Sequence, residues 1–170
     1  MALRRVGDVK RPEFQDFYQA NRDACLRSVL AVVGDRQLAE DVVAEAFTEA
    51  FASWHRVRRH PVPRAWIVRT ALNIRVSWWR RRRHEVALVG DGEVAATGQS
   101  DPAIDPAVLV VLRRLPQRQR EVVALRIFLD LDTKTTARVL GLAPGTVTAH
   151  LSRAVATLRD QLVIAEHPEV

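Results

Sequence analysis

The sequence predicts an all-α protein made of two small helical domains joined by a flexible linker. Apolar residues recur at spacings of three and four in both halves of the chain, as on one face of a helix. Between the halves, residues 85–105 hold five acidic residues, no Lys or Arg, and scattered Gly and Pro, a composition typical of a mobile linker. The expected boundaries are therefore 1–84 for the first domain, 85–106 for the linker and 107–170 for the second domain.

The composition restricts the class of protein. The chain has 170 residues, a formal net charge of +6 and a sequence pI near 10.8, which favours an acidic partner. Its first ten residues are too polar for a signal peptide, and its apolar runs are far shorter than a membrane span. The single cysteine, Cys25, excludes an internal disulfide. A soluble cytoplasmic protein that does not contact membranes is expected.

The first domain opens with two predicted helices. The first covers residues 13–33, with Tyr18 and Cys25 among its expected core residues, and Gly34 and Asp35 provide a stop and a new N-cap. The second covers residues 36–54. Its expected buried stripe consists of Val43, Phe47, Ala50, Phe51 and Trp54.

Three carboxylates at successive fourth positions form another face of the second helix: Asp41, Glu45 and Glu49. Like charges at this spacing repel each other by a few tenths of a kcal/mol per pair, about 0.2 to 0.5. A metal site is disfavoured, because helical di-metal sites also need Glu-x-x-His pairs and the chain has none. An ordinary solvated face and an acidic docking surface for a basic partner remain as alternatives.

The charge pattern changes over residues 50–84, where there are ten Arg and no Asp or Glu. An irregular loop over 54–63 carries Arg58 and Arg59, and a helix is predicted from Pro63 to His84. Trp66 and Trp78 are expected to be core residues. The inward stripe is Ile67, Ala71, Ile74 and Trp78, and the outward face is Arg69, Asn73 and Arg80, flanked by Arg75 and Trp79.

A run of four arginines, residues 80–83 with Arg81 second, continues this face. One or two cations would suit the C-terminal end of a helix dipole, but four in succession favour phosphate contact. Tryptophan beside arginine also offers flat faces for unpaired bases, so this stretch predicts binding of single-stranded nucleic acid.

The second domain is predicted to contain four helices, over 107–115, 117–128 and 134–140 and from Pro144 onward. A short helix, a turn at Gly141 and a longer helix with polar early positions describe a helix-turn-helix. A plain helical corner is the alternative. The residues expected to face DNA are Thr146, Ala149, Ser152 and Arg153, with Thr148 and His150 beside them.

Two stretches resemble the extracytoplasmic-function sigma factors of bacterial RNA polymerase, members of the sigma-70 family. The first is G-D-R-Q-L-A-E-D-V-V-A-E-A-F-T-E-A-F (34–51), continuing through P-R-A-W-I-V-R-T-A-L-N and S-W-W-R-R-R-R. The second is L-R-R-L-P-Q-R-Q-R-E-V-V-A-L-R (112–126), continuing through L-G-L-A-P-G-T-V-T-A-H-L-S-R-A. The Ser-Trp-Trp-Arg element at 77–80 is similar to an actinobacterial-type subgroup.

The resemblance implies a role for each predicted face. Asp41, Glu45 and Glu49 correspond to the segment that docks on the clamp helices of the largest subunit of core polymerase. The helix from Pro63 and the preceding Arg-rich loop correspond to the part that captures the melted minus-ten strand. The helix-turn-helix corresponds to the reader of the minus-thirty-five duplex. Core polymerase and promoter DNA are thus the implied partners, and the family also suggests an anti-sigma factor.

The same residues give weaker support to two other functions. A conventional helix-turn-helix regulator would bind duplex DNA without polymerase. An enzyme is disfavoured, because the sequence has no Gly-rich phosphate loop, Cys/His pair, metal cluster or nucleophile motif. No cofactor, metal or small-molecule substrate is expected.

Overall fold

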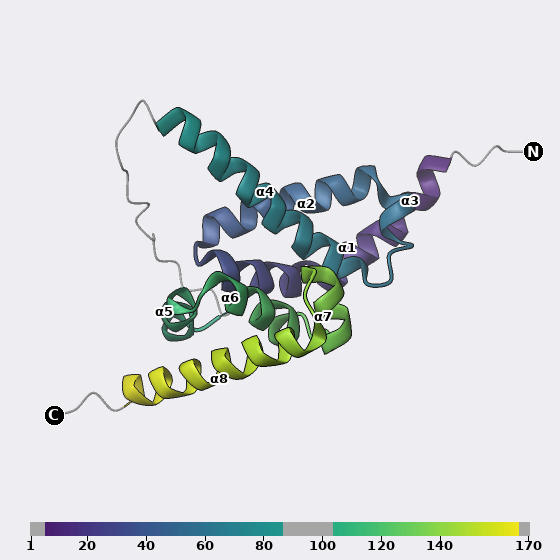
Figure 1. The fold of residues 1–170 in the computed structure, drawn as a ribbon. Helices are drawn as coiled ribbons and strands as arrows, with labels where there is room; N and C mark the ends of the chain where they lie inside the picture. The colour runs from purple at the N-terminus through teal and green to yellow at the C-terminus, as the bar shows by residue number, and fades with distance from the viewer. Residues whose placement is uncertain (1–5, 87–103, 167–170) are drawn as a thin grey trace, which may run out of the picture.

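The computed structural model describes the backbone of residues 6–86 and 104–166 and the side chains of residues 12–79 and 104–162. Within these ranges every regular element is helical, as the sequence predicted, and the helices form two modules (Figure 1). The linker predicted to be flexible falls largely on residues 87–103, outside the described residues. None of the described helices is long and apolar enough to cross a membrane.

The first module comprises α1 (Val6–Val33), α2 (Arg36–Ala52), α3 (Trp54–Val57) and α4 (Pro63–Val86). The predicted boundary between α1 and α2 is confirmed in atomic detail. Gly34 ends α1 with a φ of +76°, in the left-handed region that glycine tolerates. The Asp35 carboxylate then caps α2 by accepting a 2.7 Å hydrogen bond from the Leu38 amide.

Aromatic rings fill the space where α1, α2 and α3 meet. The Phe14 and Phe17 rings of α1 both pack against Trp54, with centroids 5.3 and 5.0 Å apart. Phe47 of α2 lies against both of these α1 rings and is 4% exposed. Edge-to-face aromatic pairs of this kind stabilise by about 0.5 to 1.5 kcal/mol beyond area burial.

Three predictions for this module are wrong. Tyr18 was expected in the core but is 36% exposed, because its ring leans on the edge of Phe47 from outside. Phe51 was expected in the buried stripe but is 44% exposed, because its ring packs only on the outer side of Phe14. Residues 54–57, expected to be irregular, form the short helix α3, which seats Trp54 and Val57 in the core.

The boundaries of α1 also differ from the prediction. The spacing of apolar residues predicted a helix over residues 13–33. In the structure α1 begins at Val6 and contains Pro12, where the ring removes one helical hydrogen bond.

The second module comprises α5 (Pro106–Arg114), α6 (Gln117–Val123), η1 (Ala124–Phe128), α7 (Thr133–Leu140) and α8 (Pro144–Glu166). The helix predicted over 117–128 is thus an α-helix followed by one π-helical turn. The wider turn is marked by the Leu129 amide, which donates to the Ala124 carbonyl at 3.0 Å. The helix-turn-helix prediction is confirmed, with Gly141 left-handed at the end of α7.

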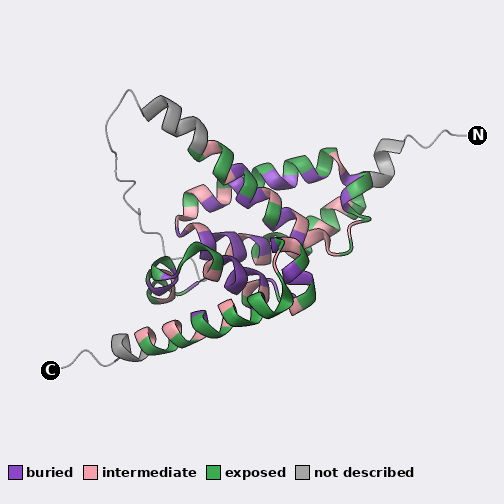
Figure 2. Ribbon diagram, in the orientation of Figure 1, coloured by how far each residue is buried: buried purple, intermediate pink, exposed green. Residues whose placement is uncertain are grey.

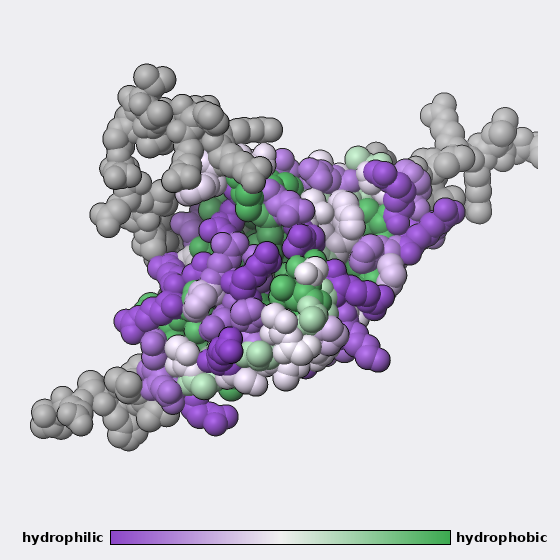
Figure 3. All heavy atoms as spheres, viewed as in Figure 1, coloured by the Kyte–Doolittle hydropathy of each residue, from purple (hydrophilic) through white to green (hydrophobic). Residues whose placement is uncertain are grey.

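The two modules pack against each other. Helix α1 lies between the α2–α4 pair and the second module, where it contacts α5, α6 and η1 (Figure 1). The buried residues of both modules form one continuous apolar cluster, visible as the buried middle of the molecule in Figure 2. The face shown in Figure 3 is one continuous surface on which hydrophilic residues surround smaller hydrophobic patches.

Removal of the Phe47 ring should destabilise the fold far more than removal of Phe51. Phe47→Ala leaves a cavity among several rings and should cost about 3 to 5 kcal/mol, whereas Phe51→Ala should cost about 1 kcal/mol. Urea unfolding followed by circular dichroism measures both. Equal losses would mean that the aromatic cluster does not depend on the inward position of Phe47.

Candidate nucleic-acid interface

The acidic row of α2 is exposed as predicted. The Asp35 cap sets the helical register, which turns Val42, Val43 and Ala46 inward and leaves Asp41, Glu45 and Glu49 in solvent. Asp41 accepts a 3.0 Å hydrogen bond from the Gln37 side chain. No described cation forms an ion pair with Glu45 or Glu49. Among the described residues, Glu45 and Glu49 therefore present negative charge without a paired cation, on a protein that is basic as a whole.

A groove of about 370 Å³ runs between α2 and α4 and joins two predicted sites. Glu45 and Glu49 line its α2 side, and Asn73 lines its α4 side. The remaining lining residues are Thr70, Ile74, Ser77 and Trp78. The acidic row of α2 and the Asn73 flank of α4 are thus neighbours in space.

Thr70 and Ser77 were not predicted as site residues. They lie three residues before and four residues after Asn73, so the helical spacing itself places them on the same flank of α4. Their hydroxyl groups add donors and acceptors beside the Asn73 amide. Their spacing from Asn73 is a signal present in the sequence, but the predicted site was chosen by arginine and tryptophan content.

The remaining predicted residues of α4 divide between different sides of the helix. Arg69 is exposed, and Trp79 is 56% exposed. Arg75 is half-buried on a different flank from Asn73, because two residues along a helix correspond to about 200°. The side chains of Arg80 and Arg81 lie outside the described residues.

Arg75 lies towards the second module. Burial, and after it the charge of Arg75, lowers the pKa of Arg120 in α6, while Glu121 opposes this effect. Arg75 is therefore not brought together with Asn73, and its place is at the border of the modules.

The loop before α4 presents Arg58 and Arg59 to solvent. Arg58 forms a 3.2 Å ion pair with Glu13 of α1, and both side chains are nearly half exposed. An exposed pair of this kind contributes at most about 1 kcal/mol. A nucleic-acid phosphate can therefore replace Glu13 at low cost.

Local contacts hold α7, the first helix of the helix-turn-helix, in place. Asp132 caps α7, and the hydrogen bond from the Thr135 amide is the main cause that lowers the pKa of the Asp132 carboxyl. A lowered pKa means that the cap stabilises the fold above the ordinary Asp pKa and loses this effect as the pH falls through the lowered value. Thr136, at 0% exposure, is buried beside it without a described hydrogen-bond partner.

Most early residues of α8 point away from the module core. Val147 and Ala154 are fully buried and Leu151 packs against the core between them, which turns the other positions of these turns outward. His150 is half-buried, with its Nδ1 atom buried and unpaired within the described residues. The predicted residues that are exposed are Thr146, Thr148, Ala149, Ser152 and Arg153.

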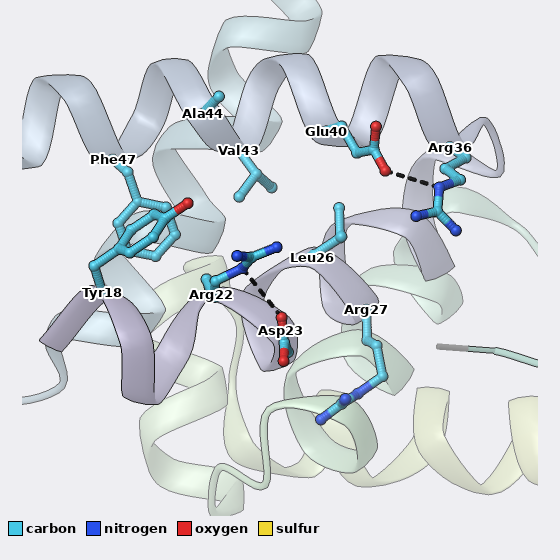
Figure 4. Close-up of a pocket in the computed structure, with 10 residues that line it drawn as sticks. All are labelled: Tyr18, Arg22, Asp23, Leu26, Arg27, Arg36, Glu40, Val43, Ala44 and Phe47. Carbon is cyan, nitrogen blue, oxygen red and sulfur yellow. Dashed lines mark hydrogen bonds and ion pairs between the residues drawn. The ribbon is translucent and has the colours of Figure 1, made fainter. Parts of the chain in front are cut away.

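A second groove, of about 530 Å³, separates α1 from α2 and was not predicted (Figure 4). Its floor is apolar, formed by Leu26, Val43 and Phe47. Its rims carry two ion pairs, Arg22 with Asp23 at 3.2 Å and Arg36 with Glu40 at 2.7 Å. This groove lies on the flank of α2 that faces away from Asn73.

The acidic, histidine and cysteine side chains of the described residues bear on metal binding and thiol chemistry. They contain no group of three or more His, Cys, Asp or Glu side chains arranged to hold a metal ion. Cys25 is 0% exposed, and burial raises the pKa of its thiol from 9.0 to about 12, with the Arg64 charge opposing the shift. A thiol with such a pKa is almost entirely protonated near neutral pH and is a poor nucleophile.

Comparison with known families points to one class of protein. The family model for sigma-70 region 2 matches residues 17–85, and the model for sigma-70, region 4 matches residues 106–158. The first match covers the acidic row and the Asn73 groove. The second covers the helix-turn-helix.

Whole-chain relatives agree with these matches. The RNA polymerase sigma-E factor of Streptomyces coelicolor is 34% identical over 89% of this chain and 86% of its own length. The RNA polymerase sigma factor SigV of Bacillus subtilis is 29% identical over 87% and 85%. Among solved structures, the sigma factor RpoE of Bartonella quintana, in complex with the anti-sigma factor NepR, has a TM-score of 0.70 and 25% identity, covering 88% of this chain and 98% of that one.

Burial of Cys25 predicts that its thiol is inert in the native protein. Ellman's reagent should react with the unfolded chain at the ordinary rate of a cysteine and with the native chain at least about a hundredfold more slowly. The colour reaction with and without urea measures this ratio. Rapid labelling of the native protein would show that the end of α1 opens readily.

Proposed function

The chain belongs to the sigma-70 family, as an extracytoplasmic-function RNA polymerase sigma factor, and we propose how its surfaces divide the work of that function. The protein is an alternative sigma factor that directs promoter-specific transcription initiation, with core polymerase and promoter DNA as its partners. The proposal assigns a polymerase-docking role to the acidic row and a strand-capture role to the groove beside it.

The shared groove is the observation that carries this assignment. Glu45 and Glu49 line the same groove as Asn73, so a basic partner that docks on α2 lies directly beside α4. The clamp helices of the largest polymerase subunit are the proposed occupant of the row. Opposite charges then guide the encounter and set the orientation of the complex. Docking thereby places the capture face against the promoter.

Strand capture is proposed to use the Asn73 flank together with the exposed ring of Trp79. The asparagine amide can both donate to and accept from a base edge. A base stacked on an aromatic ring contributes about 1 to 3 kcal/mol, enough to bias melting once polymerase positions the duplex. Phosphate contacts are assigned to the exposed arginines Arg58, Arg59 and Arg69, to the border residue Arg75, and to Arg80 and Arg81.

The exposed face of α8 is the proposed reader of the minus-thirty-five duplex. The Thr146 and Thr148 hydroxyls suit phosphate, and Ser152, Arg153 and His150 suit base edges in a major groove. Under this assignment residues 1–84 dock on polymerase and read the minus-ten element, 107–170 read the minus-thirty-five element, and 85–106 connect them.

Two finer assignments belong to the same proposal. The Ser-Trp-Trp-Arg element at 77–80 supports membership of the actinobacterial-type subgroup. The Bartonella quintana sigma factor was solved with the anti-sigma factor NepR, which supports an anti-sigma partner for this chain. The protein is a transcription initiation factor and is proposed to catalyse no covalent step.

Charge reversal of the acidic row should weaken polymerase binding. Asp41→Lys with Glu45→Lys replaces attraction by repulsion at two adjacent positions and should raise the Kd for core polymerase about tenfold or more. Titration of labelled protein with core polymerase measures the effect. The control, Asp16→Lys with Asp160→Lys, makes the same charge change at exposed positions elsewhere and should leave the Kd nearly unchanged. An equal loss of affinity in both variants would show that the acidic row does not contact polymerase.

Removal of the Asn73 amide should impair promoter opening more than closed-complex formation. Asn73→Ala should lower the open fraction up to about tenfold, the value of one or two hydrogen bonds. Permanganate footprinting reports opening, and run-off transcription with core polymerase reports the consequence. The matched control is the only other asparagine, Asn21→Ala, whose amide donates to the Phe17 carbonyl within α1. Equal loss of closed and open complexes would make Asn73 a structural residue.

A further inference from the structure

The connection between α3 and α4 is held by one histidine side chain. The His60 backbone amide donates to the Val57 carbonyl, at the end of α3, at 3.0 Å. Nδ1 of the half-buried His60 ring accepts a 3.1 Å hydrogen bond from the Val62 amide. The Val62 carbonyl in turn accepts from the Ala65 and Trp66 amides, at 3.0 and 3.3 Å, and so begins α4. His60 therefore joins the end of one helix to the start of the next.

The amino acids around Val62 leave its amide as the one backbone donor beside the ring. Residues 61–63 are Pro-Val-Pro, and proline has no backbone N–H. An N–H group that is removed from water without an acceptor destabilises a fold, so the half-buried Val62 amide needs a partner. The His60 ring supplies that acceptor.

Both ends of the connection are fixed to the core of the first module. At the α3 end, Trp54 and Val57 are 5% and 2% exposed. In the first turn of α4, the Arg64 carbonyl accepts a 3.8 Å hydrogen bond from the Cys25 thiol of α1. Residues 58–62 thus cross between two fixed points at the edge of the module (Figure 1). Because both ends are held, the bond to the ring sets the path between them.

Two exposed arginines lie on this path. The Arg58 amide donates to the Trp54 carbonyl at 3.0 Å, and the Arg59 amide donates to the Arg56 carbonyl at 3.1 Å. Within the described residues the Arg59 side chain has no hydrogen bond or ion pair, and Arg58 has only its exposed pair with Glu13. The backbone of both arginines is therefore fixed, while their guanidinium groups are available to an anion.

The His60 ring acts through its Nδ1 atom. A nitrogen that accepts a hydrogen bond carries no proton, so the ring is neutral and has its proton on Nε2. No described residue bonds Nε2. The ring therefore contributes an acceptor attached to Cγ, a position that the Oδ1 atom of an asparagine side chain would also occupy.

We propose that His60 is a positioning residue for strand capture: its ring fixes the path of residues 58–62 so that Arg58 and Arg59 meet phosphates of the melted strand. His60 itself adds no charge and does not touch the strand. A fixed backbone lets two long side chains bind with a smaller loss of conformational entropy. This inference rests on the proposed function, which assigns both arginines to phosphates, and adds the neutral side chain that controls them.

The salt dependence of strand binding tests the proposal on the holoenzyme, formed from core polymerase and the full-length chain. The probe is a fluorescent single strand with the minus-ten region of a promoter from which this protein initiates in run-off transcription. Each phosphate contact on a single strand contributes about 0.7 to the slope of log affinity against log salt. His60→Ala removes no charge, yet it should lower this slope by up to about 1.4, the value for two phosphates.

Matched variants identify the contact and the side chains through which it acts. His60→Asn keeps an acceptor for the Val62 amide and should keep the wild-type slope. The control, His55→Ala, removes an exposed histidine of α3 that has no hydrogen bond within the described residues, and it should leave the slope unchanged. In a chain with Arg58→Ala and Arg59→Ala, His60→Ala should lower the slope no further. A wild-type slope for His60→Ala, or a further fall without the arginines, overturns the proposal.

Folding and function are separated by two further measurements. Thermal unfolding followed by circular dichroism reports whether His60→Ala is folded. If it is not, His60→Gln replaces it, because glutamine carries its amide one bond further from the backbone and should also lower the slope, and a wild-type slope for this variant overturns the proposal. A wild-type chain that gives no promoter-specific run-off transcription refutes the proposed function and this inference together. A transcribing chain whose His60 variants all have the wild-type slope refutes the inference alone.

Discussion

The rest of the structure depends on the burial of α1. Its last turns are apolar on all sides, and residues Val29 and Val32 are at most 2% exposed. No single neighbour can cover a helix of that kind, so α2 and α4 pack on one side and the second module on another. Each Å² of apolar surface removed from water stabilises the fold by about 25 cal/mol. Burial of α1 therefore stabilises both the core of the first module and the contact between the two modules.

The helical period of α2 places core residues and exposed carboxylates on different sides of the helix. Its inward positions pack on α1 and α4, while its outward carboxylates face solvent. Its two flanks border different grooves, one lined by Arg36 and Glu40 (Figure 4) and the other lined by Glu45 and Glu49. A change on one flank therefore leaves the other in place. The helical period thus keeps the carboxylates that are proposed to dock on polymerase apart from the side chains of α2 that pack in the core.

Sequence reasoning succeeded where the signal is local. The Asp35 cap, the left-handed Gly34 and Gly141, the exposed acidic row and the helix-turn-helix all follow from residues within a few positions of one another. It failed for Tyr18 and Phe51, because a helical stripe does not tell which of its rings lies at the edge of the neighbouring helix. It also placed Arg75 beside the outward face of Asn73, because helical spacing does not tell which flank the second module covers.

The helical class, the two-module order, the family and the nature of each exposed face could be inferred from the amino acids alone, because periodicity, caps and charge are properties of the chain. Which faces meet depends on the three-dimensional fold. It brought Glu45 and Glu49 beside Asn73, moved Arg75 to the border, and packed the second module on α1 through Arg113 and Gly34. Contacts between residues far apart in the chain depend on shape and burial in three dimensions, which no local pattern encodes.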